Sequence, residues 1–127
     1  MHVWQPTTQE KGLFCAAAGY ALKTKEKTEY THVSIIDRNG IHIEYMHQFD
    51  PCHYIWDCLD HLDPLLIKVT KHPDNDVCNC VLRYTIHNNP LFTEGQTRAE
   101  AMAKAIIKLM ILKPEPLSTR LQLIQEE

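Results

Sequence analysis

The segment from Asp50 to Pro64, DPCHYIWDCLDHLDP, is the densest group of side chains in this chain that could bind a metal or transfer protons. Two cysteines, two histidines and four aspartates surround one tryptophan. Three interpretations are open for such a segment: a metal site, a catalytic helix, or an amphipathic helix whose polar side faces water.

Local signals predict that this segment is a short helix. Asp50 is a good N-cap, Pro51 suits the first helical position, and Asp63 precedes a proline that ends the helix. At about 100° per residue, the side chains separate into two groups. The apolar side holds Cys52, Ile55, Trp56, Leu59 and Leu62, and the polar side holds His53, Asp57, Asp60 and His61.

This separation argues against a metal site on the helix. A zinc ion needs four ligands that converge on one point at about 2 Å. His53 and His61 are two turns apart, about 12 Å along the helix axis, so they cannot bind one ion together. Chelation by Asp57 with one of these histidines is a weaker alternative, and a solvated polar face is favoured.

Five cysteines occur in the chain, an odd number whose spacing matches no disulfide framework. Cys78 and Cys80 alternate with Asn79, so they share a strand face with Leu82, Tyr84 and Ile86. We therefore expect buried structural thiols and no cofactor. A metal site made of Cys78, Cys80 and a histidine from another element is the alternative.

The triplet His32-Val33-Ser34 resembles half of the paired His-x-Ser/Thr signature of the 2H phosphoesterases. That family needs two such triplets, and no other histidine here begins a second one. The resemblance implies a small phosphoesterase as an alternative function. Its candidate catalytic residues on one sheet face would be His32, Ser34, His42 and Glu44.

The first part of the chain predicts a helix and a hairpin. Thr7 and Glu10 form a capping box, and helical spacing continues through Tyr20 and Ala21. The segment KTKEKTE then reads as a solvated connector.

In the hairpin that follows, a three-residue loop, Arg38 to Gly40, would pair Asp37 with Ile41 and Ile35 with Ile43. One face would carry Val33, Ile35, Ile41, Ile43 and Tyr45, and the other His32, Ser34, His42 and Glu44, with Ile36 and Met46.

The second part predicts another hairpin and a helix. Strands at 65–71 and 77–86 flank the turn HPDND, and the segment 87–96 reads as a loop. Thr97 and Glu100 form a capping box that opens a helix over 99–112. The element order predicts one α+β domain over residues 1–127, with a four-stranded, mostly antiparallel sheet packed by helices. A short last helix in the tail, 114–127, would present Leu117, Leu121 and Ile124 for docking or dimerisation.

Composition excludes several classes of protein. The chain has 127 residues, 44% of them hydrophobic and 23% charged, which is ordinary for one soluble domain. No apolar run is long enough to span a bilayer and no secretory signal is evident, so we expect a cytoplasmic protein with no membrane partner. A formal charge of −3 makes direct nucleic-acid binding unfavourable.

The segment FTEGQTRAEAMAKAIIKLM resembles the last helix of double-stranded RNA-binding domains. In those domains a lysine cluster at the helix start meets the phosphates, whereas Lys104 and Lys108 lie further along this helix. An RNA-binding domain is therefore a minor alternative, as is a metal-binding domain.

A helix with a tryptophan (Ile55-Trp56), a strand at 81–86 and a helix at 97–110 resemble the small α-β-α sandwich proteins of bacteriophages and prophages. The resemblance covers about residues 51–112 and implies a non-enzymatic accessory protein that binds a host macromolecular complex, for example as an anti-CRISPR-like inhibitor of host defence. Its partner would be a host protein or ribonucleoprotein with a basic surface, in the host cytoplasm. Candidate contact residues are Asp57, Asp60, His61, Asp63, Leu117, Leu121 and Ile124, and the chain would be a candidate homodimer.

Overall fold

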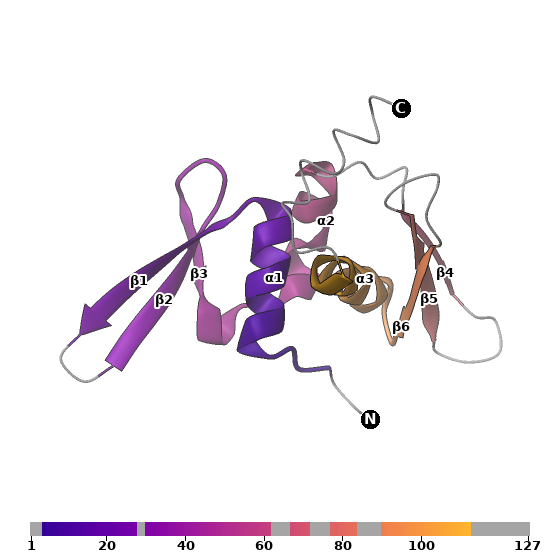
Figure 1. Cartoon of the computed structure of the whole chain (residues 1–127), viewed down its shortest axis with the longest axis horizontal. Helices are drawn as coiled ribbons and strands as arrows, with labels where there is room; N and C mark the ends of the chain where they lie inside the picture. Colours follow the sequence, from indigo (N-terminus) through magenta and orange to yellow (C-terminus); the bar gives the residue numbers. More distant parts are fainter. Residues whose placement is uncertain (1–3, 28–29, 62–66, 72–76, 84–89, 113–127) are drawn as a thin grey trace.

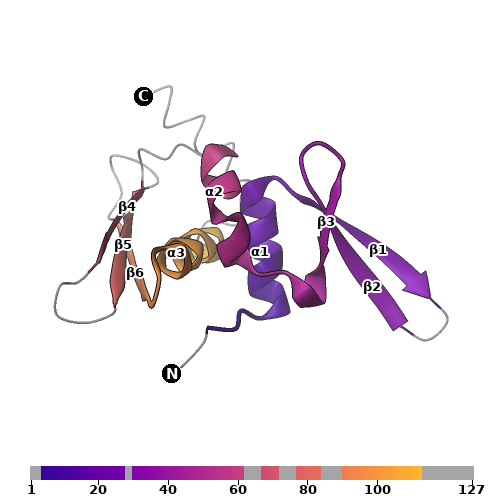
Figure 2. The same cartoon turned by 180° about the vertical axis from the view of Figure 1, so that it is seen from behind.

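The structure, a computed structural model, describes residues 4–27, 30–61, 67–71, 77–83 and 90–112. Within these ranges the chain has three α-helices and two three-stranded antiparallel sheets, ordered β1-β2-β3 and β4-β5-β6. The helices lie between the two sheets (Figure 1), and the same order is visible from behind (Figure 2). The predicted α+β class is confirmed, whereas the predicted single four-stranded sheet is wrong.

Helix α1 spans Thr8–Ala18 and begins with the predicted capping box. The Thr7 hydroxyl accepts from the Glu10 N–H at 3.1 Å, and the Glu10 carboxylate accepts from the Thr7 N–H at 2.8 Å. The helix ends earlier than predicted because Gly19 adopts the left-handed conformation, with φ of 79°. Tyr20 therefore lies beyond the helix, where its N–H donates to the Cys15 carbonyl.

Strand β1, Ala21–Lys27, replaces the predicted connector. It pairs antiparallel with β2, Tyr30–Ile36, over seven residue pairs from Ala21–Ile36 to Lys27–Tyr30. Pairing with β2 supplies the backbone hydrogen bonds that lysine-rich segments do not form alone, and exposed edge strands tolerate lysine well. Tertiary pairing therefore overrides the weak strand propensity of this segment.

The loop between β2 and β3, His42–Tyr45, has the three-residue form that the sequence predicts. The Asp37 N–H donates to the Ile41 carbonyl at 2.8 Å, and Gly40 has φ of 81°. The register then shifts: Ile36 pairs with His42, whereas Ile35 pairs with Glu44. Ile43 is thus the extra residue of a β-bulge, and the predicted pair of Ile35 with Ile43 is wrong.

The bulge changes which side chains share a face. Ser34 pairs with Tyr45, so Tyr45 joins His32 and His42 on the face predicted to be polar. Glu44 instead lies on the face of the fully buried Ile35. The predicted polar face therefore loses its carboxylate and gains an aromatic ring.

Helix α2, Pro51–His61, follows a single 3-10 turn, Met46–Gln48. Its position agrees with the prediction, but Trp56 does not belong to its buried side. The Trp56 side chain is 63% exposed, whereas the buried residues are Pro51, Ile55, Cys58 and Leu59. The face of α2 that contacts α1 and α3 is narrower than the apolar side predicted from the sequence, so Trp56 lies just outside the contacting face.

The second sheet consists of β4, Ile67–Lys71, β5, Cys78–Leu82, and β6, Leu91–Gly95. Strand β6 was predicted to be a loop, but all five of its residues pair with β5. Helix α3, Arg98–Leu112, agrees with the prediction and packs on this sheet and on α1 and α2. Several predicted residues lie outside the described ranges: Asp63, Tyr84, Ile86, Leu117, Leu121 and Ile124.

Two lysines of α3 reach the backbone of β6, an edge strand of the second sheet. Lys104 Nζ donates to the Glu94 carbonyl at 3.4 Å, and Lys108 Nζ donates to the Phe92 carbonyl at 3.3 Å. These carbonyls are two residues apart, so they point to the same side of the strand. Helix and strand edge are thus joined by side chains as well as by the core.

The core lies between the sheets and is centred on α3, whose residues are buried along most of its length. The largest fully buried side chains include Phe14, Ile35, Ile55 and Ile106. The Phe14 ring packs against the Phe49 ring with centroids 5.9 Å apart. No helix within the described ranges has the length and apolarity that crossing a membrane requires.

Candidate functional site

Arg38, in the loop between β2 and β3, joins that loop to α1 and α2. Its guanidinium lies 3.0 Å from Asp57 Oδ1 and also donates to the Ala18 carbonyl. The Tyr20 hydroxyl donates to Asp57 Oδ2, and the Arg38 guanidinium lies 5.8 Å from the centre of the Tyr20 ring. Tyr20, Arg38 and Asp57 form a connected group, which we call the Arg38 clamp.

The clamp determines the electrostatics at the end of α2. Burial, followed by the hydrogen bond to Asp57, raises the pKa of Tyr20, so this hydroxyl stays protonated and donates. Burial, followed by the nearby Arg38, lowers the pKa of His61. His61 also lies close to the turn at Gly19, where an added Cβ would be 3.0 Å from His61 Nε2. Asp57 and His61 therefore have partners or neighbours inside the molecule.

The outward side of α2 carries His53, Trp56 and Asp60, which follow helical spacing and are all exposed. We call these three residues the α2 face. His53 Nε2 lies 3.4 Å from Asp50 Oδ2. The indole of Trp56 is the largest exposed side-chain group of the α2 face. Of the residues predicted for binding, Asp60 lies on this face and Asp57 belongs to the clamp. No sequence signal distinguished the exposed Trp56 from a core tryptophan.

Four aromatic rings gather on the first sheet and the turn that follows it: His32, His42, Tyr45 and His47. The Tyr45 ring is central, with centroids 4.8 Å from His42, 5.3 Å from His32 and 6.0 Å from His47. His32 and His47 are 6.2 Å apart. We call these residues the ring cluster. The sequence predicts that His32 and His42 share this face but not that Tyr45 joins them, because Tyr45 reaches the face only through the bulge.

The residues of the phosphoesterase alternative do not assemble as expected. His32 and His42 share a sheet face. Ser34, in the central strand β2, is on the same face but is only 9% exposed. Glu44 lies on the opposite face, because of the bulge. Glu44 Oε1 accepts from the Tyr45 N–H at 2.9 Å. The expected set of His32, Ser34, His42 and Glu44 is therefore divided between two faces.

Cys78 and Cys80 are buried on the side of the second sheet that α3 covers, as the alternation predicts. Burial raises the pKa of Cys80, and a hydrogen bond with Thr93 partly offsets this shift. In the part of the chain that the structure describes, no three His, Cys, Asp or Glu residues lie close enough to hold a metal ion.

The buried thiols should be unreactive in the folded protein. Burial raises the pKa values of Cys15, Cys52 and Cys58 to about 12. At pH 8 only about one such thiol in ten thousand is ionised, and the thiolate is the nucleophile. We expect iodoacetamide to leave Cys15 and Cys58, which have no exposed surface, unlabelled at pH 8 in native protein and to label all five cysteines in urea. Peptide mapping by mass spectrometry measures this, and fast native alkylation of Cys58 would contradict the expected burial.

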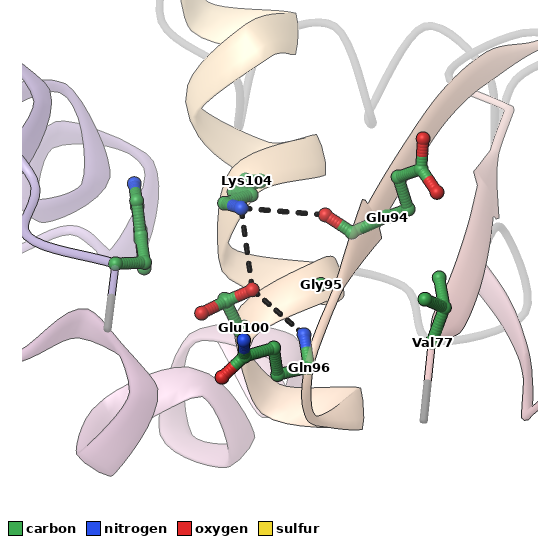
Figure 3. Close-up of a pocket in the computed structure, with 7 residues that line it drawn as sticks. Val77, Glu94, Gly95, Gln96, Glu100 and Lys104 are labelled. Carbon is green, nitrogen blue, oxygen red and sulfur yellow. Dashed lines mark hydrogen bonds and ion pairs between the residues drawn. The ribbon is translucent and has the colours of Figure 1, made fainter. Parts of the chain in front are cut away.

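A hollow of about 220 Å³ opens between the start of α3 and the second sheet, with Trp4 at its margin. Figure 3 shows Glu100 bridging Lys104 and the backbone of Gln96 there. Glu100 Oε2 accepts from the Gln96 N–H at 2.8 Å and from Lys104 Nζ at 3.2 Å. The nearly buried Glu100 carboxylate thus has hydrogen-bond donors within the protein, and its bond from Gln96, which directly follows β6, holds the end of that strand against α3.

Comparison with known proteins finds no matching family model, and no curated protein or solved structure matches the chain. The assignment of a function therefore depends on the geometry of the chain itself.

Proposed function

We propose that this chain is a non-enzymatic binding protein that engages a basic surface of a partner protein through its α2 face. The observation that carries the proposal is the exposed indole of Trp56, which stands on a well-packed helix between His53 and Asp60. Tryptophan is among the residues that most often dominate binding energy at protein interfaces. The resemblance to phage and prophage accessory proteins makes a host macromolecular complex, such as a defence system, the favoured partner.

Electrostatics supports a partner of positive charge. The Asp60 carboxylate is exposed beside Trp56, and the chain carries a formal charge of −3. Charges at the rim of an interface steer association and select partners, whereas a central aromatic residue supplies most of the affinity. The α2 face has both parts, within two turns of one helix.

The Arg38 clamp determines how this proposal is tested. Replacing Asp57 by lysine would set two cations against each other and leave the Tyr20 hydroxyl without its acceptor. Loss of binding in such a variant would therefore be confused with loss of structure. Trp56 and Asp60 are the better positions, since neither is part of the clamp.

We expect Trp56→Ala to weaken binding of the cognate partner by about thirtyfold or more, with unchanged thermal stability. Affinity capture from bacterial lysate, quantified by mass spectrometry, compares the wild type, Trp56→Ala and the control Phe92→Ala. Phe92 is a matched control because it is also an exposed aromatic residue, at 64%, and lies on β6 of the second sheet, away from α2. Proteins kept by the control but lost by Trp56→Ala are then purified and titrated calorimetrically, with Asp60→Lys as a second variant.

The proposal fails if Trp56→Ala captures the same proteins in the same amounts as the wild type. It also fails if purified candidates bind Trp56→Ala and the wild type with equal affinity.

A further inference from the structure

We propose that the face of the β1-β2-β3 sheet that carries the ring cluster binds single-stranded nucleic acid. Exposed rings on an antiparallel sheet are a recurrent platform for unpaired bases, which stack on them, while cations nearby meet the phosphates. This surface is separate from the α2 face, so the inference goes beyond the proposed protein contact.

Three of the four rings are exposed, and each lies next to another ring of the cluster. Tyr45 is 40% exposed, and His42 and His47 are exposed on either side of it. Centroid distances of 4.8 Å to 6.2 Å make a continuous aromatic surface from His42 to His32. Base–aromatic stacking tolerates any sequence, because every base has a π-face. The surface therefore fits a run of unpaired bases without requiring particular ones.

The rings are also held in place before any ligand arrives. Pairing of Tyr45 with Ser34 and of His42 with Ile36 fixes two of them on the sheet. Lys11 Nζ donates to the Met46 carbonyl at 3.1 Å and to the His47 carbonyl at 3.3 Å, which fixes the turn that carries His47. A fixed platform loses little conformational entropy when it binds, which favours affinity.

The charge of this face differs from that of the whole chain. Lys23 pairs with Ser34, which pairs with Tyr45, so an exposed ammonium group lies in the same row as the central ring. No carboxylate belongs to the strand residues whose side chains the structure describes on this face: Ala21, Lys23, His32, Ser34, Ile36, His42 and Tyr45. The net charge of −3 belongs to the chain as a whole, so it does not exclude a local contact between this face and phosphates.

The same features select single strands over duplexes. In a duplex the bases are stacked on one another, and their faces are unavailable to the rings. Lys23, whose side chain the structure describes on this face, gives by itself only modest attraction to the backbone, so stacking must supply much of the affinity. RNA and DNA single strands offer the same stacking chemistry, and the experiment compares them.

Fluorescence anisotropy with fluorescein-labelled dT and rU oligonucleotides of about twelve nucleotides tests this inference, with the labelled duplex as a comparison. We expect single strands to bind better than duplex at low salt. Tyr45→Ala should weaken binding by about fivefold or more, whereas Phe92→Ala on the other sheet should not. Lys23→Ala should reduce the slope of log K against log salt by about 0.7, and Lys68→Ala should leave it unchanged.

His42→Ala and His47→Ala keep the inference testable if Tyr45→Ala does not fold, because both side chains are exposed. Absence of single-strand binding by the wild type at low salt would overturn the inference. Equal losses for Tyr45→Ala and Phe92→Ala, or equal affinity for duplex, would also overturn it. Trp56→Ala should retain oligonucleotide binding, so failure of the protein contact and failure of this inference are distinguishable.

Discussion

Gly95→Ala is expected to lower the free energy of unfolding by about 3 kcal/mol, because the added methyl group has no space. A Cβ at this position would lie 2.5 Å from Glu100 Oε2 and 2.8 Å from the Ala101 backbone nitrogen. The Glu100 side chain cannot move aside without losing its hydrogen bonds from Gln96 and Lys104. The start of α3 would therefore separate from the end of β6.

Gly12→Ala is the matched control for this variant. Nothing lies within 4 Å of a Cβ at Gly12, which is inside α1. Alanine there should raise stability by up to about 1 kcal/mol through helix propensity. Urea denaturation of both variants measures the difference. A loss of less than about 0.5 kcal/mol for Gly95→Ala would mean that β6 and α3 are not packed as described.

Phe14→Ala is expected to cost about 3–5 kcal/mol, the usual cost of removing a fully buried aromatic ring. Phe14 has no exposed surface and packs on Phe49, which in turn stacks on Tyr54 at 5.0 Å. Removing the ring leaves a cavity among α1, the 3-10 turn and α2. Phe49 and Tyr54 cannot move far enough to fill this cavity, because they belong to elements that are held by their own contacts.

Phe92→Ala separates the loss of burial from the loss of a ring. Its side chain is mostly exposed, so we expect a change within about 0.5 kcal/mol. Thermal or urea unfolding followed by circular dichroism compares the two variants. Equal destabilisation by Phe14→Ala and Phe92→Ala would contradict the position of Phe14 in the core.

Local signals predicted well those parts of the fold that depend on neighbouring residues. The Thr7–Glu10 capping box, the glycine turn at Gly40 and the helix from Arg98 are each set within a few residues of sequence. The Thr97 hydroxyl also accepts from the Glu100 N–H, as predicted, but the Glu100 side chain turns to Gln96 instead. Short-range chemistry was thus sufficient for helix starts and for tight turns.

Features that depend on distant pairing were not predictable in this way. Strand β1 is rich in lysine and β6 follows a proline, so only their partners β2 and β5 make them strands. The bulge at Ile43 moves Glu44 and Tyr45 to new faces, and no pattern within the hairpin indicated it. The exposure of Trp56 depends on how wide a face α1 and α3 cover. These are tertiary outcomes that local periodicity does not encode.

The two lysine contacts along β6 affect how copies of this chain can meet. An edge strand with free carbonyls offers a template on which a strand of another molecule can add, and repeated addition leads to fibres. At Glu94 and Phe92 the acceptors are already occupied by Lys104 and Lys108, whose aliphatic stems lead from α3 to the strand. A strand of a second molecule would have to displace two ammonium groups to extend the sheet at this edge. Helix α3, which forms much of the core, thus also shields the β6 edge of the second sheet from strand addition.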